Sequence, residues 1–244
     1  MLTIADPLMT RWGHDGLARP YWRLYWNTHP SWTITYDHRT IALGPERIVL
    51  IAPETIYRGQ GRTLTSHVFL HFTCDSLPGD PLTAVHVLPC TEAFILLLVQ
   101  LRERSADLTC DAIALACHAL GRLPQKAYSV RRSSGPIAAA QSLAERFLHR
   151  SVTNDELARV AKMHVNAFIR RFRADTGETP RQWHLRRRID AACVALEAGH
   201  SIDTVAENFG FCDRHHLTRV FTRIRGCGPA TYRESATNVR TPQR

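Results

Sequence analysis

Two predicted helices in the second half of the chain carry side chains that could read the base edges of a DNA duplex. At 100° per residue, the helix at 165–175 places Asn166, Ile169, Arg170 and Arg173 together on its outer face. The helix at 214–225 leaves His215, Thr218, Arg219 and Thr222 outward, with Arg214 in its first turn. A helix fits the major groove, where Arg can pair with guanine and Asn with adenine. One such helix alone is more often a solvated amphipathic helix.

The two helices belong to a segment that occurs twice. At one constant offset, each residue of the first copy has a counterpart of similar type: Phe168 and Leu217, Arg170 and Arg219, Phe172 and Phe221, Gly177 and Gly226, Pro180 and Pro229, Trp183 and Tyr232. Each copy predicts a short apolar helix, a tight turn and an arginine-bearing helix. Candidate N-caps are Asn154, Thr179, Ser201 and Asp213, and candidate helix stops are Gly177, Gly199 and Gly226. Two helix-turn-helix units in matching register favour DNA binding.

This pattern resembles the DNA-binding domain of the AraC/XylS family of bacterial transcription regulators. The matching positions are Leu157–Ala158, Arg170–Phe172, Gly177–Pro180, Arg188, Val205–Ala206, Gly210–Phe211, Arg219–Phe221, Gly226–Pro229 and Tyr232–Arg233. The resemblance implies base contacts from Asn166, Ile169 and Arg170, and from Arg214, His215, Thr218 and Arg219. It also implies double-stranded DNA and RNA polymerase as partners. His164 departs from the family, which usually has a capping Ser there, so this helix end is expected to be weaker.

Basic residues are concentrated in the half that carries the repeat. Residues 135–244 contain 18 Lys and Arg against 11 Asp and Glu, whereas residues 1–134 contain 13 against 11. This distribution suits a polyanionic partner, although a solvated basic surface would look the same. The run Arg186–Arg187–Arg188 lies on a predicted long helix at 180–198. A phosphate contact from Arg186 or Arg187 and plain solvated charge remain equally open.

The first ninety residues read as short strands separated by turn residues. The runs YWRLYW, WTITY, TIAL, RIVLIA, HVFLHF and TAVHVL are rich in aromatic and β-branched residues, with Asn27 and Gly59–Gly61 among the expected turns. They predict a small antiparallel barrel or sandwich. A cupin-like barrel that binds a small effector often precedes the DNA-binding domain in the AraC/XylS family. Candidate residues for a sugar-like effector are Trp22, Trp26, Trp32, Tyr36, Tyr57, Arg58, His67 and His71, although any single aromatic residue among them is more often barrel core.

No cofactor and no metal site are expected. The chain has no His-x-His pair, and His67 and His71 lie about 13 Å apart along a strand, too far to ligate one ion. This argues against the rival hypothesis of a cupin-type enzyme fused to a DNA-binding module. A third hypothesis keeps the C-terminal DNA-binding domain and gives the N-terminal half a role in dimerisation only, without a ligand.

Two apolar helical stretches within 91–120 follow the strands. They contain more apolar side chains, from Phe94 to Leu120, than a hairpin on a small barrel would bury, which predicts a homodimer interface. The seven cysteines are odd in number and form no CxxC pair, as expected for reduced cysteines in a cytoplasmic protein. No signal peptide is expected, and the apolar stretch 94–101 is too short to cross a membrane.

The sequence therefore predicts an α+β protein that is not an enzyme. A cupin-like antiparallel β-barrel with a helical hairpin spans 1–123, where it senses an effector and dimerises. A linker at 124–136 precedes an all-α domain with two helix-turn-helix units at 137–234. Residues 235–244 are expected to form a disordered tail. The predicted function is a sequence-specific transcription regulator, an activator that responds to a small molecule.

Overall fold

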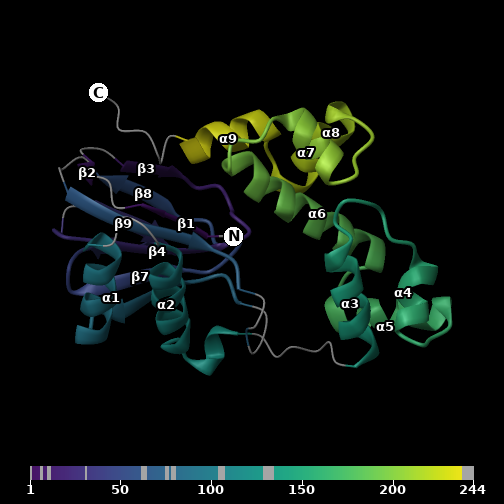
Figure 1. Ribbon diagram of the computed structural model, residues 1–244, viewed down its shortest axis with the longest axis horizontal. Helices are drawn as coiled ribbons and strands as arrows, with labels where there is room; N and C mark the ends of the chain where they lie inside the picture. The colour runs from purple at the N-terminus through teal and green to yellow at the C-terminus, as the bar shows by residue number, and fades with distance from the viewer. Residues whose placement is uncertain are drawn as a thin grey trace. The chain divides into compact units, whose positions relative to one another are not determined.

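A computed structural model describes residues 2–5, 8–9, 12–30, 32–61, 65–74, 77, 81–103, 108–128 and 135–237. The described chain divides into two compact units, one within Met1–Ser129 and the other within Val130–Thr237. The N-terminal unit combines strands with two helices, and the C-terminal unit contains helices (Figure 1). The predicted α+β composition is therefore confirmed.

The strands of the N-terminal unit form two antiparallel sheets. Their bounds are β1 Leu2–Ala5, β2 Leu8–Met9, β3 Trp12–Asp15, β4 Trp22–Asn27, β5 Trp32–Tyr36, β6 Arg39–Leu43, β7 Arg47–Ile51, β8 Arg58–Gly61, β9 Thr65–Phe72 and β10 Val85–Pro89. One sheet has the order β1-β9-β4-β7-β10, with β2 also paired to β9, and the other has the order β3-β8-β5-β6. The predicted antiparallel strands therefore form a sandwich of two sheets packed face to face, rather than a closed barrel.

Strand alternation divides the core of this unit into two layers. Successive side chains of a strand point to opposite faces of the sheet. In β4, Trp22 and Leu24 therefore face the helices α1 (Glu92–Glu103) and α2 (Leu108–Gly121), which cover one side of the larger sheet. Tyr25 faces the opposite way and packs against Trp32 and Ile34 of the smaller sheet. Both faces of the larger sheet are thus buried in its central strands β4, β7 and β9.

Two predicted turns are in fact strand. Asn27 ends β4, and Gly59–Gly61 belong to β8, which pairs with β5. Glycine is needed at position 61 because a Cβ there would lie 2.2 Å from the indole ring of the buried Trp32. Glycine within a strand commonly marks such a close approach. A reading of glycine as a turn residue therefore missed this strand.

The C-terminal unit contains seven helices within residues 135–237. They are α3 Pro136–Arg146, α4 Asn154–Val160, α5 Val165–Thr176, α6 Pro180–Glu197, α7 Ile202–Asn208, α8 Arg214–Arg225 and α9 Pro229–Thr237. Phe168, Phe172 and Trp183 belong to one hydrophobic cluster, and Leu217, Phe221 and Tyr232 belong to another. The unit is therefore two helix-turn-helix subdomains with separate cores, joined by α6. We call α3–α5 the first subdomain and α7–α9 the second.

The borders of the units differ from the predicted ones. Gln125–Ala127 forms a 3₁₀ helix, and Tyr128 packs against the core of the N-terminal unit, so residues 124–128 do not behave as linker. Residues 129–134 of the predicted linker lie outside the described residues. At the other end α9 continues to Thr237, three residues into the predicted tail, whose remainder also lies outside them.

Candidate nucleic-acid interface

The first helix-turn-helix is fixed by a capping box and an aromatic core. Thr153 caps α4, with its hydroxyl accepting from the Glu156 backbone N–H while Glu156 accepts from the Thr153 N–H at 2.8 Å. The predicted cap, Asn154, is instead the first helical residue. Arg150 also pairs with Glu156 at 2.8 Å, and these contacts lower the pKa of Glu156 to about 2. Phe168 and Phe172 bury one face of α5 and leave the opposite face to solvent.

The second helix-turn-helix repeats this design, and its recognition helix α8 has a side-chain cap that α5 lacks. Ser201 and Asp213 cap α7 and α8, as predicted, and the Asp213 carboxylate accepts from the His216 N–H at 2.7 Å. That hydrogen bond lowers the pKa of Asp213. At the equivalent position of α5, the His164 side chain makes no capping hydrogen bond. The first recognition helix thus lacks the side-chain cap that the second one has, and its weaker start stays a prediction.

The outer faces of α5 and α8 carry the predicted DNA-contacting residues. Asn166, Arg170 and Arg173 are exposed on α5, whereas Ile169 is partly buried and packs against the core of the first subdomain. On α8, Arg214, His215 and Arg219 are exposed. Thr218 is half-buried and donates to the Arg214 carbonyl at 2.7 Å. Each helix thus presents basic and polar groups to solvent on the face opposite its buried apolar side chains.

The exposed arginines of the two helices are not equally available. Among the described residues, Arg170, Arg173 and Arg219 have no ion-pair partner. Arg214 lies 3.7 Å from the Asp203 carboxylate, and Arg171, on another side of α5, pairs with Asp175 at 3.0 Å. An Arg that is not held by an acid is available to bind phosphate or the edge of guanine. Arg170 and Arg219 occupy the same position of the two repeats.

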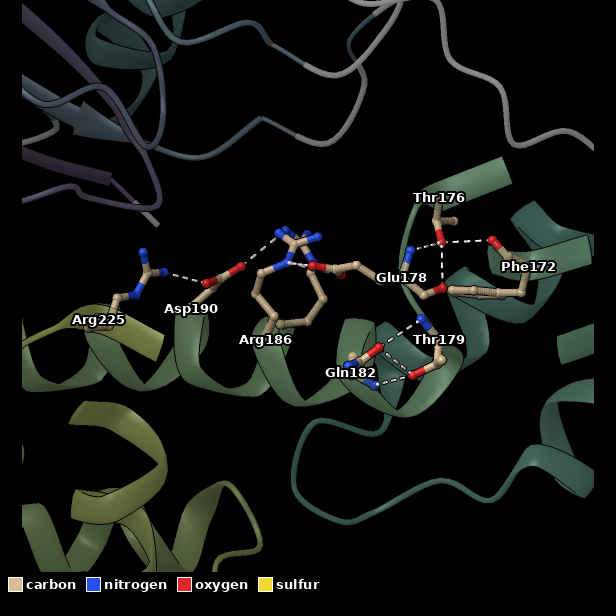
Figure 2. A network of polar contacts seen from close by, with 9 residues as sticks. Phe172, Thr176, Glu178, Thr179, Gln182, Arg186, Asp190 and Arg225 are labelled. Atoms are coloured by element: carbon tan, nitrogen blue, oxygen red, sulfur yellow. Dashed lines mark hydrogen bonds and ion pairs between the residues drawn. The ribbon is translucent and has the colours of Figure 1, made fainter. Parts of the chain in front are cut away.

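The three consecutive arginines of α6 all have internal partners. Arg186 donates to both carboxylate oxygens of Glu178, at 3.1 and 3.2 Å, and Figure 2 shows this pair beside Asp190 along the helix. Arg187 pairs with Glu145 at 3.0 Å. Arg188 is only 5% exposed, and its burial lowers its pKa. Solvated charge does not describe the buried Arg188, and a phosphate contact from the partly exposed Arg186 or Arg187 stays a prediction.

The long helix α6 separates the recognition helices. Its 18 residues span about 27 Å at 1.5 Å per residue, compared with about 34 Å for one turn of DNA. Thr179 and Gln182 form the capping box that begins the helix, with the Thr179 hydroxyl 2.8 Å from Gln182 Oε1 (Figure 2). The separation suits two successive segments of major groove.

In the N-terminal unit, three of the residues predicted to bind an effector lie together between the sheets. Tyr57, His67 and His71 are all buried around Tyr25. The Tyr25 hydroxyl is 2.7 Å from the Tyr57 hydroxyl and 3.4 Å from His71 Nε2, and the rings of Tyr25 and His67 stack at 5.3 Å. Burial lowers the pKa of His67 to about 3 and raises that of Tyr57 well above its usual value. His67 is therefore neutral near pH 7.

Of the other predicted effector residues, only Trp32 lies beside this cluster. Trp22 lies on the helix-covered face of the sheet, and Trp26 packs beside it and donates to the Pro45 carbonyl at 3.1 Å. Tyr36 donates to the Thr83 carbonyl at 3.2 Å, and Arg58 is exposed. Trp32 belongs to the core between the sheets, with its ring 4.7 Å from that of His67.

The sequence reasoning missed the polar residues of β4 that complete the cluster. Arg23 and Asn27 are buried on the same face as Tyr25. The Arg23 guanidinium lies 4.7 Å from the centroid of the Tyr57 ring and donates to the Thr55 carbonyl at 2.8 Å. Asn27 Oδ1 is 2.7 Å from His67 Nδ1. The alternation of strand residues would have placed these groups together had it been applied to β4.

Two further properties of the described residues bear on the sequence predictions. No group of three or more His, Cys, Asp or Glu side chains among them is arranged to hold a metal ion. None of the described helices combines the length and apolar character needed to cross a membrane.

Comparison with known proteins identifies the helical unit. Residues 157–235 match the model of a helix-turn-helix domain. Over 88 residues the chain is 31% identical to the MmsAB operon regulatory protein of Pseudomonas aeruginosa, and over 89 residues it is 30% identical to the probable transcriptional regulator LumQ of Photobacterium leiognathi. The helical unit is therefore a helix-turn-helix domain similar in sequence to those of the two regulators. These matches cover 36% of this chain, and 29% and 36% of the two relatives.

The likeness of fold extends over both units. ToxT of Vibrio cholerae has a TM-score of 0.58 at 12% identity, with 96% of this chain and 98% of ToxT covered. A ToxT structure with a bound unsaturated fatty acid gives the same TM-score at 13% identity, covering 98% of this chain and 96% of that one. At this identity the comparison shows a shared fold, in which paired antiparallel sheets are followed by two helix-turn-helix subdomains.

Proposed function

We propose that the protein is a transcription regulator that binds double-stranded DNA through α5 and α8 together. The observation that carries this proposal is the pair Arg170 and Arg219. They are equivalent residues of the two repeats, both exposed and both without an ion-pair partner among the described residues. Base contacts from Asn166, Ile169, Arg173, Arg214, His215 and Thr218 belong to the same proposal. Activation through RNA polymerase, in the cytoplasm, follows from the AraC/XylS resemblance.

Selection of duplexes from a random-sequence pool by the full chain tests this function. We expect the selected duplex to contain two conserved segments, centred about one DNA turn, or ten base pairs, apart on the same face. Footprinting of that duplex should show protection of both segments. A single protected segment of about five base pairs would contradict reading by both subdomains, and a pool without enrichment would contradict sequence-specific binding.

We also propose that the N-terminal unit binds a small-molecule effector between its sheets. Support comes from the buried polar cluster of Arg23, Tyr25, Tyr57, His67 and His71, and from the shared fold with ToxT, one structure of which contains an unsaturated fatty acid. A sugar-like ligand has less support, because Trp22 and Trp26 do not join this cluster. Thermal-shift screening of sugars and carboxylic acids, with His71→Phe as the matched variant, tests the proposal. A shift that His71→Phe does not alter would contradict this location.

Homodimerisation through α1 and α2 is a further part of the proposal. Phe94, Leu98 and Leu101 are buried against the sheet, so the predicted apolar excess is partly used within the chain. Four large apolar side chains of these helices nevertheless remain 41–59% exposed: Ile95, Leu96, Val99 and Ile113. Exposed apolar clusters of this kind mark interfaces more often than isolated residues do.

Light scattering of the full chain tests the dimer. We expect a dimer at micromolar concentration, and we expect Leu96→Glu to give a monomer because a charge would be buried at the interface. Ile56→Glu is the matched control, since Ile56 is 63% exposed in the same unit but does not lie on α1 or α2. A wild-type monomer, or equal dissociation by both variants, would rule out this interface.

A further inference from the structure

Arg188 joins the two helix-turn-helix subdomains from the buried side of α6. Its guanidinium donates to the Phe209 carbonyl at 2.8 Å and to the Gly210 carbonyl at 2.6 Å, both in the turn of the second subdomain. It also donates to the Ser151 hydroxyl at 3.2 Å, in the loop that precedes α4 of the first subdomain. The same guanidinium lies 4.4 Å from the centroid of the Phe211 ring. One side chain therefore contacts both subdomains.

The backbones of the two subdomains also meet directly beside Arg188. Gly210 has a φ of +64°, and a Cβ at this position would lie 2.4 Å from the His149 carbonyl oxygen and 2.9 Å from Arg150 Cα. The α7–α8 turn thus lies against the α3–α4 loop with no room for a side chain. We call this region, formed by His149, Arg150, Ser151, Arg188, Phe209 and Gly210, the inter-subdomain contact.

A second set of contacts runs along another side of α6. Glu145 of α3 pairs with Arg187, Arg187 lies 3.6 Å from Asp190, and Asp190 pairs with Arg225 at the end of α8 (Figure 2 shows the last pair). The pairs made by Arg187 are partly exposed and are individually weak. Asp190 and Arg225 are only 14% and 5% exposed in their side chains. This pair ties α8 to α6 but does not reach the first subdomain by itself.

The second subdomain packs on the C-terminal half of α6, because Ile189, Cys193 and Leu196 belong to its core. The chain then leaves α6 through Gly199, with a φ of +95°, and α7 begins only at Ile202. The orientation of α8 relative to α5 therefore depends on this packing and on contacts that bridge the two subdomains. Arg188 is suited to provide them, because its planar guanidinium directs several donors at fixed angles, which a lysine ammonium cannot reproduce.

We propose that Arg188 is a positioning residue that fixes the spacing and angle between the recognition helices α5 and α8. It restricts DNA binding to sites whose two segments have one separation, while Arg188 itself is buried and touches no DNA. The role in DNA recognition rests on the proposed function; the rigid spacing of the helices does not. The two parts are tested separately.

The first experiment measures the spacing without DNA. Spin labels are placed at Ala174→Cys and Arg223→Cys, exposed and repeat-equivalent positions of α5 and α8, after the native cysteines other than the buried Cys193 are changed to serine. We expect a narrow distance distribution in the otherwise native chain and a broader one with Arg188→Lys. Arg186→Gln is the control, because Arg186 pairs with Glu178 and makes no inter-subdomain contact.

The second experiment measures DNA spacing. The full chain is bound to the duplex it selects from a random pool, and to the same duplex with one to three base pairs inserted between the two segments. Each inserted pair rotates the second segment by about 34°, so we expect native affinity to fall at least tenfold per insertion. Arg188→Lys should bind the original duplex about tenfold more weakly than the native chain does. Each inserted base pair should then lower the affinity of this variant only two- to threefold. Arg186→Gln should retain the native spacing penalty.

The outcomes separate the two proposals. The positioning role would be overturned if Arg188→Lys kept the narrow distance distribution of the native chain. It would also be overturned if Arg188→Lys bound every duplex more weakly but lost the same affinity per inserted base pair as the native chain. If Arg188→Lys does not fold, Ser151→Ala removes only one acceptor from the inter-subdomain contact and should broaden the distances in the same direction. If the native chain selects no duplex, the proposed function fails, and the distance measurement alone decides the role of Arg188.

Discussion

Replacing Gly210 with alanine is expected to lower the free energy of unfolding of the C-terminal unit by about 2–5 kcal/mol. The φ of +64° is unfavourable for alanine and costs about 1–2 kcal/mol. The new methyl group would also overlap the His149 carbonyl and Arg150 Cα, both backbone atoms that cannot rotate away. The backbone shifts needed to remove this overlap lower the free energy of unfolding by about 1–3 kcal/mol more. Urea unfolding of the full chain, followed by circular dichroism of its helices, measures the loss.

Gly226→Ala is the matched control for this substitution. Gly226 ends α8 with a φ of +77°, and an added Cβ would meet no atom within 4 Å. Its replacement should therefore lower the free energy of unfolding only by the same backbone strain, about 1–2 kcal/mol. The difference between the two variants isolates the close approach between the subdomains. Equal losses in Gly210→Ala and Gly226→Ala would show that the two backbones do not meet at Gly210.

The recognition helices could be predicted from the sequence because local chemistry defines them. Asp213, Thr179 and Ser201 cap the helices that follow them, and Gly177 and Gly226 end α5 and α8 in the left-handed conformation. Caps and glycine stops depend on residues three or four positions away, within reach of a sequence pattern. The one misplaced cap, Asn154 for Thr153, was an error of a single residue at a helix start.

The partners of the α6 arginines could not be predicted in the same way. Arg187 pairs with Glu145, 42 residues earlier, and Arg188 binds carbonyls 21 and 22 residues later. Backbone acceptors leave no mark on the sequence, because every residue has a carbonyl. In the sequence the run of three arginines therefore looks like a surface charge cluster. In the structure each of the three binds a carboxylate or a carbonyl outside α6.

The predicted effector residues come together only in part, for a different reason. Residue type does not show which face of a strand each aromatic side chain occupies. Trp22 and Tyr25 lie in the same strand but point into different layers, because their positions differ by an odd number. The second sheet also depends on β8, whose glycines resemble a turn. If β8 is taken for a turn, β5 loses the strand that pairs with it on one side, and the second sheet is not predicted.

Removing both Arg170 and Arg219 is expected to weaken binding to the selected duplex by about 2–6 kcal/mol, at least thirtyfold. A bidentate arginine–guanine contact contributes about 1–3 kcal/mol of discrimination. The two side chains lie on different recognition helices, on either side of α6, so their losses should add. Each single variant should relax base preference at one position, Arg170→Ala in one segment and Arg219→Ala in the other. Equilibrium binding to all single-base variants of the duplex measures both effects.

Arg171→Ala separates base recognition from loss of charge. Arg171 is the neighbour of Arg170 on α5 and is exposed, but it faces another side of the helix and pairs with Asp175 at 3.0 Å. Its removal takes away the same charge, so we expect only a small loss, equal for all sequences. Arg170→Ala could instead behave like Arg171→Ala, with lower affinity and unchanged base preference. The slope of the logarithm of the binding constant against the logarithm of salt concentration would then fall by about one, and Arg170 would be a phosphate contact. Base recognition by α5 would then fall to Asn166 and Ile169, because they share the outer face with Arg170.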